Sequence, residues 1–318
     1  PTATRPRLGI EWRACRTRCR PGRCRHTPHE ARAGGASALW QPGRAIVDHG
    51  LPFRFATMNH ALLFSVFIVA SCGLAYELIA GALASYLLGD SVTQFSTVIG
   101  SYLFAMGVGS WLSRYVERRL VARFIQVELM VGVFGGFSAA GLFFVFAWSS
   151  APFKLALYLA VVGIGVLVGL EIPLIMRILE RDLAFKDLVS QVLTFDYLGA
   201  LAVSILFPVV LVPHLGLMRS ALLFGLLNVA VALWACWLFR EQLRNVGWLG
   251  AQGGASMLLL LAAFAAAGEL TSLAEAHLYA DDIVHAESTP YQRIVVTRWK
   301  DDLRLHLNNN LQFSSRDE

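Results

Sequence analysis

Four carboxylate side chains lie within, or at the ends of, long apolar runs: Glu77, Glu128, Glu171 and Asp196. A charge in hydrocarbon is costly, so residues of this kind usually face a bundle interior or a cavity, where they bind cations or relay protons. Pro173 follows Glu171 closely and is expected to bend its helix and free a backbone carbonyl. The sequence therefore suggests an intramembrane polar site formed by Glu77, Glu171 and Asp196.

A structural role is the alternative for each of these residues. Carboxylates near helix ends can pair with loop arginines or cap the first turn. Glu128 and Asp196 lie close to the starts of their apolar runs, which favours the structural role for them. For Glu77 and Glu171 both roles remain open.

The elements that would position these carboxylates are apolar runs long enough to cross a bilayer, which takes about 20 residues. The chain of 318 residues is 56% hydrophobic and only 15% charged. These features predict an all-α polytopic membrane bundle of about seven transmembrane helices, multi-pass in the cell (inner) membrane, with the lipid bilayer as its partner. The predicted spans are Ala61–Leu88, Ser91–Ser113, Phe124–Trp148, Phe153–Ile175, Leu193–Pro213, Leu217–Phe239 and Trp248–Ala267.

Residues 1–57 have a different composition and contain eleven Arg against three acidic residues. The net charge of +5 for the whole chain therefore comes from this tail and predicts no nucleic-acid partner. Met58 precedes the first apolar run, so we expect the tail to be a wrongly assigned start or disordered. A targeting peptide is one alternative. A zinc site is another, but the Cys and His spacings fit no common zinc module, and we predict no metal site.

The composition changes again after residue 268. Residues 268–285 are polar and acidic and suggest a linker or short helix. The β-branched run that ends at Trp299 predicts a strand, and residues 300–302 predict a turn. Leu303, Leu305 and Leu307 then alternate with polar residues, which predicts a second strand before another turn and a third strand. We expect three regions: 1–57, a helical domain at 58–268, and at 269–318 a linker with the start of a β-hairpin region of an α/β domain.

Several short motifs, taken in order, resemble the spermidine synthases (polyamine aminopropyltransferases), and in particular the membrane-bound bacterial members with a multi-span N-terminal half. The C-terminal motifs are Tyr291–Ile294 and Leu311–Glu318. Those of the apolar block are Tyr76–Leu78, Leu83–Ser91, Gly169–Pro173 and Asp196–Ala200. Each motif alone is weak, but their order makes the resemblance fairly specific over roughly residues 60–318.

The resemblance implies transfer of an aminopropyl group from decarboxylated S-adenosylmethionine, as co-substrate, to putrescine. It implies a catalytic domain of Rossmann-like fold, a polyamine substrate, no tightly bound cofactor and a homo-oligomer formed through the synthase domain. Gln292 matches the Gln of the family's Tyr-Gln pair, which contacts the nucleoside. The family's catalytic residues have no counterparts here, so we expect a fragment that is inactive by itself.

Two other functions remain open at this point. The chain could transport or export a cationic metabolite such as a polyamine, with Glu77 and Glu171 along the path. It could also serve purely as a structural anchor, in which case both carboxylates would be dispensable for activity.

Overall fold

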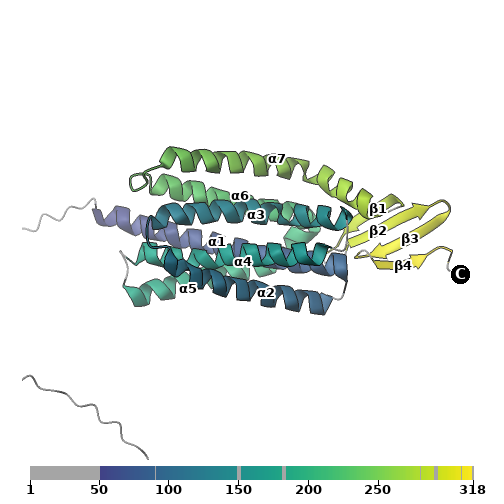
Figure 1. The fold of residues 1–318 in the computed structure, drawn as a ribbon, viewed down its shortest axis with the longest axis horizontal. Coiled ribbons are helices and arrows are strands. Elements are labelled where there is room, and N and C mark those ends of the chain that lie inside the picture. The colour runs from purple at the N-terminus through teal and green to yellow at the C-terminus, as the bar shows by residue number, and fades with distance from the viewer. Residues whose placement is uncertain are drawn as a thin grey trace, which may run out of the picture. The chain divides into compact units, whose positions relative to one another are not determined.

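The structure is a computed structural model that describes residues 51–89, 91–148, 152–180, 184–279, 281–289, 293–308 and 310–316. Residues 48–318 form one compact unit. Long helices run beside one another, and strands follow the last of them (Figure 1). The helices are α1 (Leu51–Leu88), α2 (Ser91–Leu112), α3 (Leu120–Trp148), α4 (Phe153–Leu179), α5 (Phe185–Leu206), α6 (Val212–Leu238) and α7 (Val246–Leu278), with short turns η1 (Ser113–Tyr115) and η2 (Phe207–Leu211).

Local sequence explains where several helices begin and end. Gly89 has a φ of 71° and its N–H donates to the Ser85 carbonyl at 3.1 Å, so a left-handed glycine ends α1. Pro152 precedes the first residue of α4, where its missing N–H costs little. Helix α4 continues past Pro173 to Leu179.

Small residues allow the helices to pack closely. A side chain at Gly109 of α2 would overlap the Val166 carbonyl of α4, and one at Gly169 of α4 would overlap the Met106 carbonyl of α2. Helices α3 and α6 approach each other in the same way at Gly132 and Gly225. The buried core runs through all seven helices.

The predicted fold class is corrected in its membrane assignment, which the structure does not establish. Six stretches of the described residues, not seven, are long and apolar enough to cross a membrane. The two predicted runs Leu193–Pro213 and Leu217–Phe239 fall within one stretch of 54 residues, Phe185–Leu238. Gly216 lies between the two runs and has a non-helical backbone (φ 72°, ψ 174°), so the helix is interrupted where the sequence predicts a break. Length and composition do not establish that these helices enter a bilayer, so what the structure shows is a mainly helical fold with a small C-terminal sheet.

In the C-terminal part, the three predicted strands are present, and one strand that was not predicted precedes them. Four strands form an antiparallel sheet in the order β1-β2-β3-β4, where the sequence suggested a hairpin region opening an α/β domain. The strands are β1 (Asp282–Ser288), β2 (Arg293–Trp299), β3 (Asp302–Leu307) and β4 (Asn310–Ser314). Strand β1 was not predicted, because its segment is polar and was taken as part of a linker.

Candidate functional site

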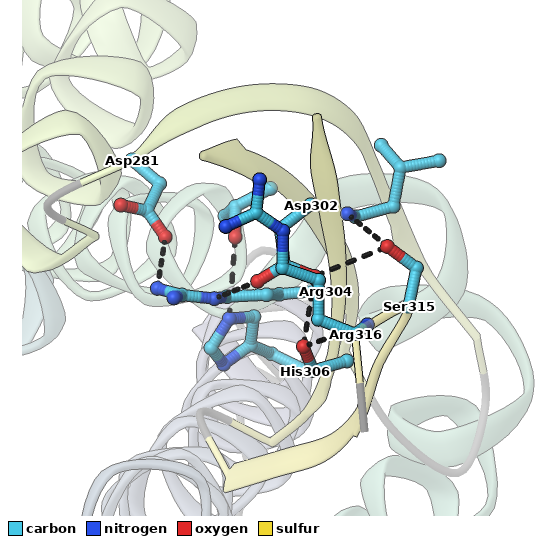
Figure 2. A network of polar contacts seen from close by, with 9 residues as sticks. Asp281, Asp302, Arg304, His306, Ser315 and Arg316 are labelled. Carbon is cyan, nitrogen blue, oxygen red and sulfur yellow. Dashed lines mark hydrogen bonds and ion pairs between the residues drawn. The ribbon is translucent and has the colours of Figure 1, made fainter. Parts of the chain in front are cut away.

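A polar network joins the start of the sheet to strands β3 and β4 (Figure 2). Arg304 lies between two carboxylates: its Nε donates to Asp302 Oδ2 and its Nη1 to Asp281 Oδ2, each at 2.8 Å. The other oxygen of Asp302 accepts hydrogen bonds from the hydroxyls of Ser314 at 2.8 Å and Ser315 at 3.1 Å. The cross-strand pairing of Arg304 with Ser314 places these groups together.

The network keeps its two main groups charged. The hydrogen bond from Ser314 contributes most to lowering the pKa of Asp302, and those from Arg304 and Ser315 contribute less. The hydrogen bond to Asp302 raises the pKa of Arg304. The side chain of Asp302 is only 3% exposed and is fully engaged, so it holds strands together and is not available as a base.

His306 belongs to the same face of the sheet. Its Nε2 lies 3.3 Å from Thr297 Oγ1, and its ring meets the Tyr279 ring edge-on at 5.1 Å. Burial lowers the pKa of His306, so the imidazole is neutral at pH 7. Tyr279 and Asp281 follow α7 directly, so His306 and Arg304 fasten the sheet to the end of that helix.

A cavity of about 760 Å³ lies where the helices meet the sheet. Its walls come from α1, α3 and the α5–α6 connection, and from the sheet. Apolar side chains make up the larger part of the lining, and the polar and charged ones are Ser85, Tyr86, Ser204, His214, Thr271, Glu287, Thr289, Arg293 and Asn308. A cavity of this size and composition suits a small organic ligand with one or two polar groups.

The predicted nucleoside-contacting residue Gln292 lies outside the described residues. The nearest described residues on either side, Thr289 and Arg293, both line the cavity. The predicted role of Gln292 therefore stays a prediction.

The predicted polar site falls in the helical region. Glu171 is 1% exposed, Glu77 is 8% exposed and Asp196 is half-buried. Glu171 is close enough to Asp196 for the two to interact electrostatically, and it also interacts with Glu128, which is completely buried. The structure thus brings Glu171 together with Glu128 and Asp196, and a cation-binding role stays a prediction.

The sequence reasoning missed the Asp281–Asp302–Arg304 network, because it treated residues 300–302 as a turn. One signal could have revealed it. Asp302, Arg304 and His306 lie two residues apart, so they share one face of a strand. A carboxylate, a guanidinium and an imidazole at that spacing can form a polar row on the sheet.

Comparison with known proteins identifies relatives of this chain. It is 64% identical over 266 residues to polyamine aminopropyltransferase 2 of Ralstonia nicotianae, covering 82% of this chain and 52% of the relative. It is 52% identical over 261 residues to the polyamine aminopropyltransferase of Leptospira interrogans, with coverage of 82% and 52%. Against the Mycobacterium tuberculosis protein of that name, identity is 37% over 277 residues, with coverage of 81% and 51%.

The chain spans about half the length of these curated relatives. No protein-family model matches it, and no solved structure matches it. Over the part of the chain that aligns, this protein is therefore a homologue of proteins named polyamine aminopropyltransferase.

Proposed function

We propose that this chain takes part in polyamine aminopropyl transfer, with decarboxylated S-adenosylmethionine as donor and putrescine as acceptor. The observation that carries the proposal is the 64% identity over 266 residues to a protein named polyamine aminopropyltransferase. The donor and acceptor follow from the resemblance to spermidine synthases. The cavity at the junction of helices and sheet supports the proposal, because its size and mostly apolar lining suit a small organic ligand.

A chimera tests this function. The segment of the Ralstonia nicotianae relative that aligns with this chain is replaced by this chain, and the product is expressed in cells that make no spermidine of their own. Cell extracts are supplied with putrescine and decarboxylated S-adenosylmethionine, and spermidine is measured by chromatography. We expect spermidine at a rate close to that of the unmodified relative.

The control is the same relative with an unrelated helical segment of equal length in that position. We expect its rate to fall, because the sheet network and the cavity lining would be lost. A chimera that accumulates like the unmodified relative, yet forms no spermidine, would refute the proposed function.

We further propose that the protein resides in a membrane and contacts lipid through its helices. Support comes from six described stretches that are long and apolar enough to span a bilayer, with a mean hydropathy between 1.3 and 2.4. Alkaline carbonate extraction of cell membranes is the test, and the protein should remain in the pellet. Recovery in the supernatant without detergent would overturn this location.

A further inference from the structure

A buried polar cluster lies among four helices, away from the sheet and outside the cavity lining. It consists of Tyr76 on α1, Glu128 on α3, Glu171 on α4 and Asn228 on α6; we call it the carboxylate cluster. Exposure is 2% for Tyr76, 0% for Glu128, 1% for Glu171 and 0% for Asn228. Each of these side chains is thus removed from solvent.

Contacts with α3 show that the cluster converges. On α3, Gly132 follows Glu128 by four residues and Gly135 follows Gly132 by three. The three positions therefore share one face of the helix. The Tyr76 ring occupies the space of the absent side chain at Gly135. A Cβ at Gly132 would lie 3.3 Å from the Asn228 Cβ. Tyr76 also lies near enough to Glu128 and Glu171 for its hydroxyl to feel the charge of both carboxylates.

Most polar atoms of the carboxylate cluster have no hydrogen-bond partner among the residues that the structure describes. These atoms are both oxygens of Glu128, Oε1 of Glu171, the Tyr76 hydroxyl and both amide atoms of Asn228. Buried polar atoms are normally paired, and a buried unpaired charge is strongly unfavourable. A partner that carries hydrogen-bond donors and positive charge would satisfy the oxygens among them.

The surrounding titratable groups do not supply that charge. The titratable groups that interact electrostatically with the carboxylates are Cys72 of α1 and Tyr102 of α2, and Asp196 of α5 interacts with Glu171. The Tyr102 hydroxyl is already engaged, because it donates to the Gly73 carbonyl at 2.8 Å. Within the described part of the chain, no ion pair to Glu128 or Glu171 is seen.

We propose that the carboxylate cluster is a binding site for a primary alkylammonium group. Such a group has three N–H donors and one positive charge, which match two carboxylates and the oxygens of Tyr76 and Asn228. A metal ion fits less well, because the described residues contain no group of three or more His, Cys, Asp or Glu that could hold one. Naming a polyamine as the source of the ammonium group rests on the proposed function.

Equilibrium binding of radiolabelled putrescine to the detergent-purified 318-residue chain tests the site. We expect saturable binding that unlabelled butylamine displaces, since one ammonium group is sufficient. Glu128→Gln and Glu171→Gln should each weaken binding at least about tenfold, because a charge-assisted hydrogen bond is lost. Tyr76→Phe should weaken it several-fold. The matched control is Glu180→Gln, an exposed carboxylate at the end of the same helix as Glu171, which should bind like the parent.

Three results would overturn the proposal. One is no saturable putrescine binding by the parent chain. Another is unchanged binding by Glu128→Gln and Glu171→Gln variants that elute as folded protein in size-exclusion chromatography. The third is displacement of putrescine by sodium as effectively as by butylamine, which would indicate an inorganic cation site. The assay contains no aminopropyl donor, so its outcome is independent of the chimera experiment on transfer.

Discussion

The close crossing of α2 and α4 makes a quantitative prediction at Gly109. In the variant Gly109→Ala, the new methyl group would overlap the carbonyl oxygen of Val166. It would also lie 2.9 Å from that carbonyl carbon and 3.1 Å from the carbonyl carbon of Gly169. These are backbone atoms of a helix, so they cannot rotate away as a side chain could. The two helices must move apart for the methyl group to fit.

Two opposing effects set the size of the change. Alanine favours the helical conformation over glycine by about 1 kcal/mol. Overpacking a tight contact typically costs about 1–3 kcal/mol, and contact with rigid backbone belongs at the upper end. We therefore expect Gly109→Ala to lower the free energy of unfolding by about 1–2 kcal/mol.

Gly107 of the same helix is the matched control. A Cβ there meets nothing within 4 Å, so only the helix-propensity gain of about 1 kcal/mol remains. Unfolding in detergent, followed by circular dichroism, should show a lower midpoint for Gly109→Ala and an equal or higher one for Gly107→Ala. Equal midpoints for the two variants would mean that α2 and α4 do not cross as closely as the structure shows.

Three further substitutions probe other parts of the fold. Asp302→Asn should loosen the pairing of β3 with β4, seen as faster amide exchange in β4. In the parent, the same loosening should appear only in acid, as the pH falls through the lowered pKa of Asp302, which lies below the ordinary value of 3.8. The reason is that the folded state prefers the ionised form. If the protection of the β4 amides, relative to their intrinsic exchange rates, does not fall in acid, that result would argue against the network. Tyr102→Phe removes a 2.8 Å hydrogen bond to the Gly73 carbonyl and should lower the free energy of unfolding by about 1–3 kcal/mol. The control Tyr158→Phe loses an exposed hydrogen bond to the Thr97 hydroxyl, so it should lower that free energy less. Gly216→Ala places a side chain at φ 72° and ψ 174°, a region essentially restricted to glycine. It should lower the free energy of unfolding by about 1–3 kcal/mol, although the new Cβ would meet no atom within 4 Å. An unchanged thermal midpoint would contradict that backbone geometry.

The strands show what sequence pattern can and cannot predict. The β-branched run at residues 294–297 and the alternation in residues 303–307 predict β2 and β3, and the structure contains both. The same alternation does not reveal which face is buried. Leu303 is 43% exposed, whereas Asp302 is 2% exposed, because the polar face carries the network with Arg304. The hydropathy of a single strand cannot predict that a carboxylate is buried when its hydrogen-bond partners come from other strands.

Strand β1 illustrates a second limit. It contains His285 and Glu287 and has no strong β propensity of its own. Its conformation comes from pairing with β2, whose Val295 opposite Ala286 is completely buried. A strand that depends on a tertiary partner in this way looks like a polar linker when it is read alone.

Glu128 shows how an error of a few residues changes the interpretation of a site. Its predicted run begins at Phe124, which places the carboxylate close to the start of the run and favours a structural role. Helix α3 begins at Leu120, so Glu128 lies more than two turns inside it and is completely buried. Helix ends are the least certain part of a hydropathy pattern, since polar residues can occupy the first turns. The sequence could identify the carboxylate but not the three helices that enclose it.

The break between α5 and α6 and the cavity have a common cause. Pro208 and Pro213 lack the N–H groups that a regular helix would use, so the backbone there cannot keep its normal pattern. The segment η2 has the wider π-helical backbone instead of a regular α-helical one. The Val210 carbonyl in this segment has the His214 ring Nδ1 as a hydrogen-bond partner at 2.9 Å. Irregular backbone cannot pack as tightly as two regular helices with small residues between them, and this segment lines the cavity along most of its length. The prolines that disturb the regular helix in this segment therefore also create the space in which a ligand could bind.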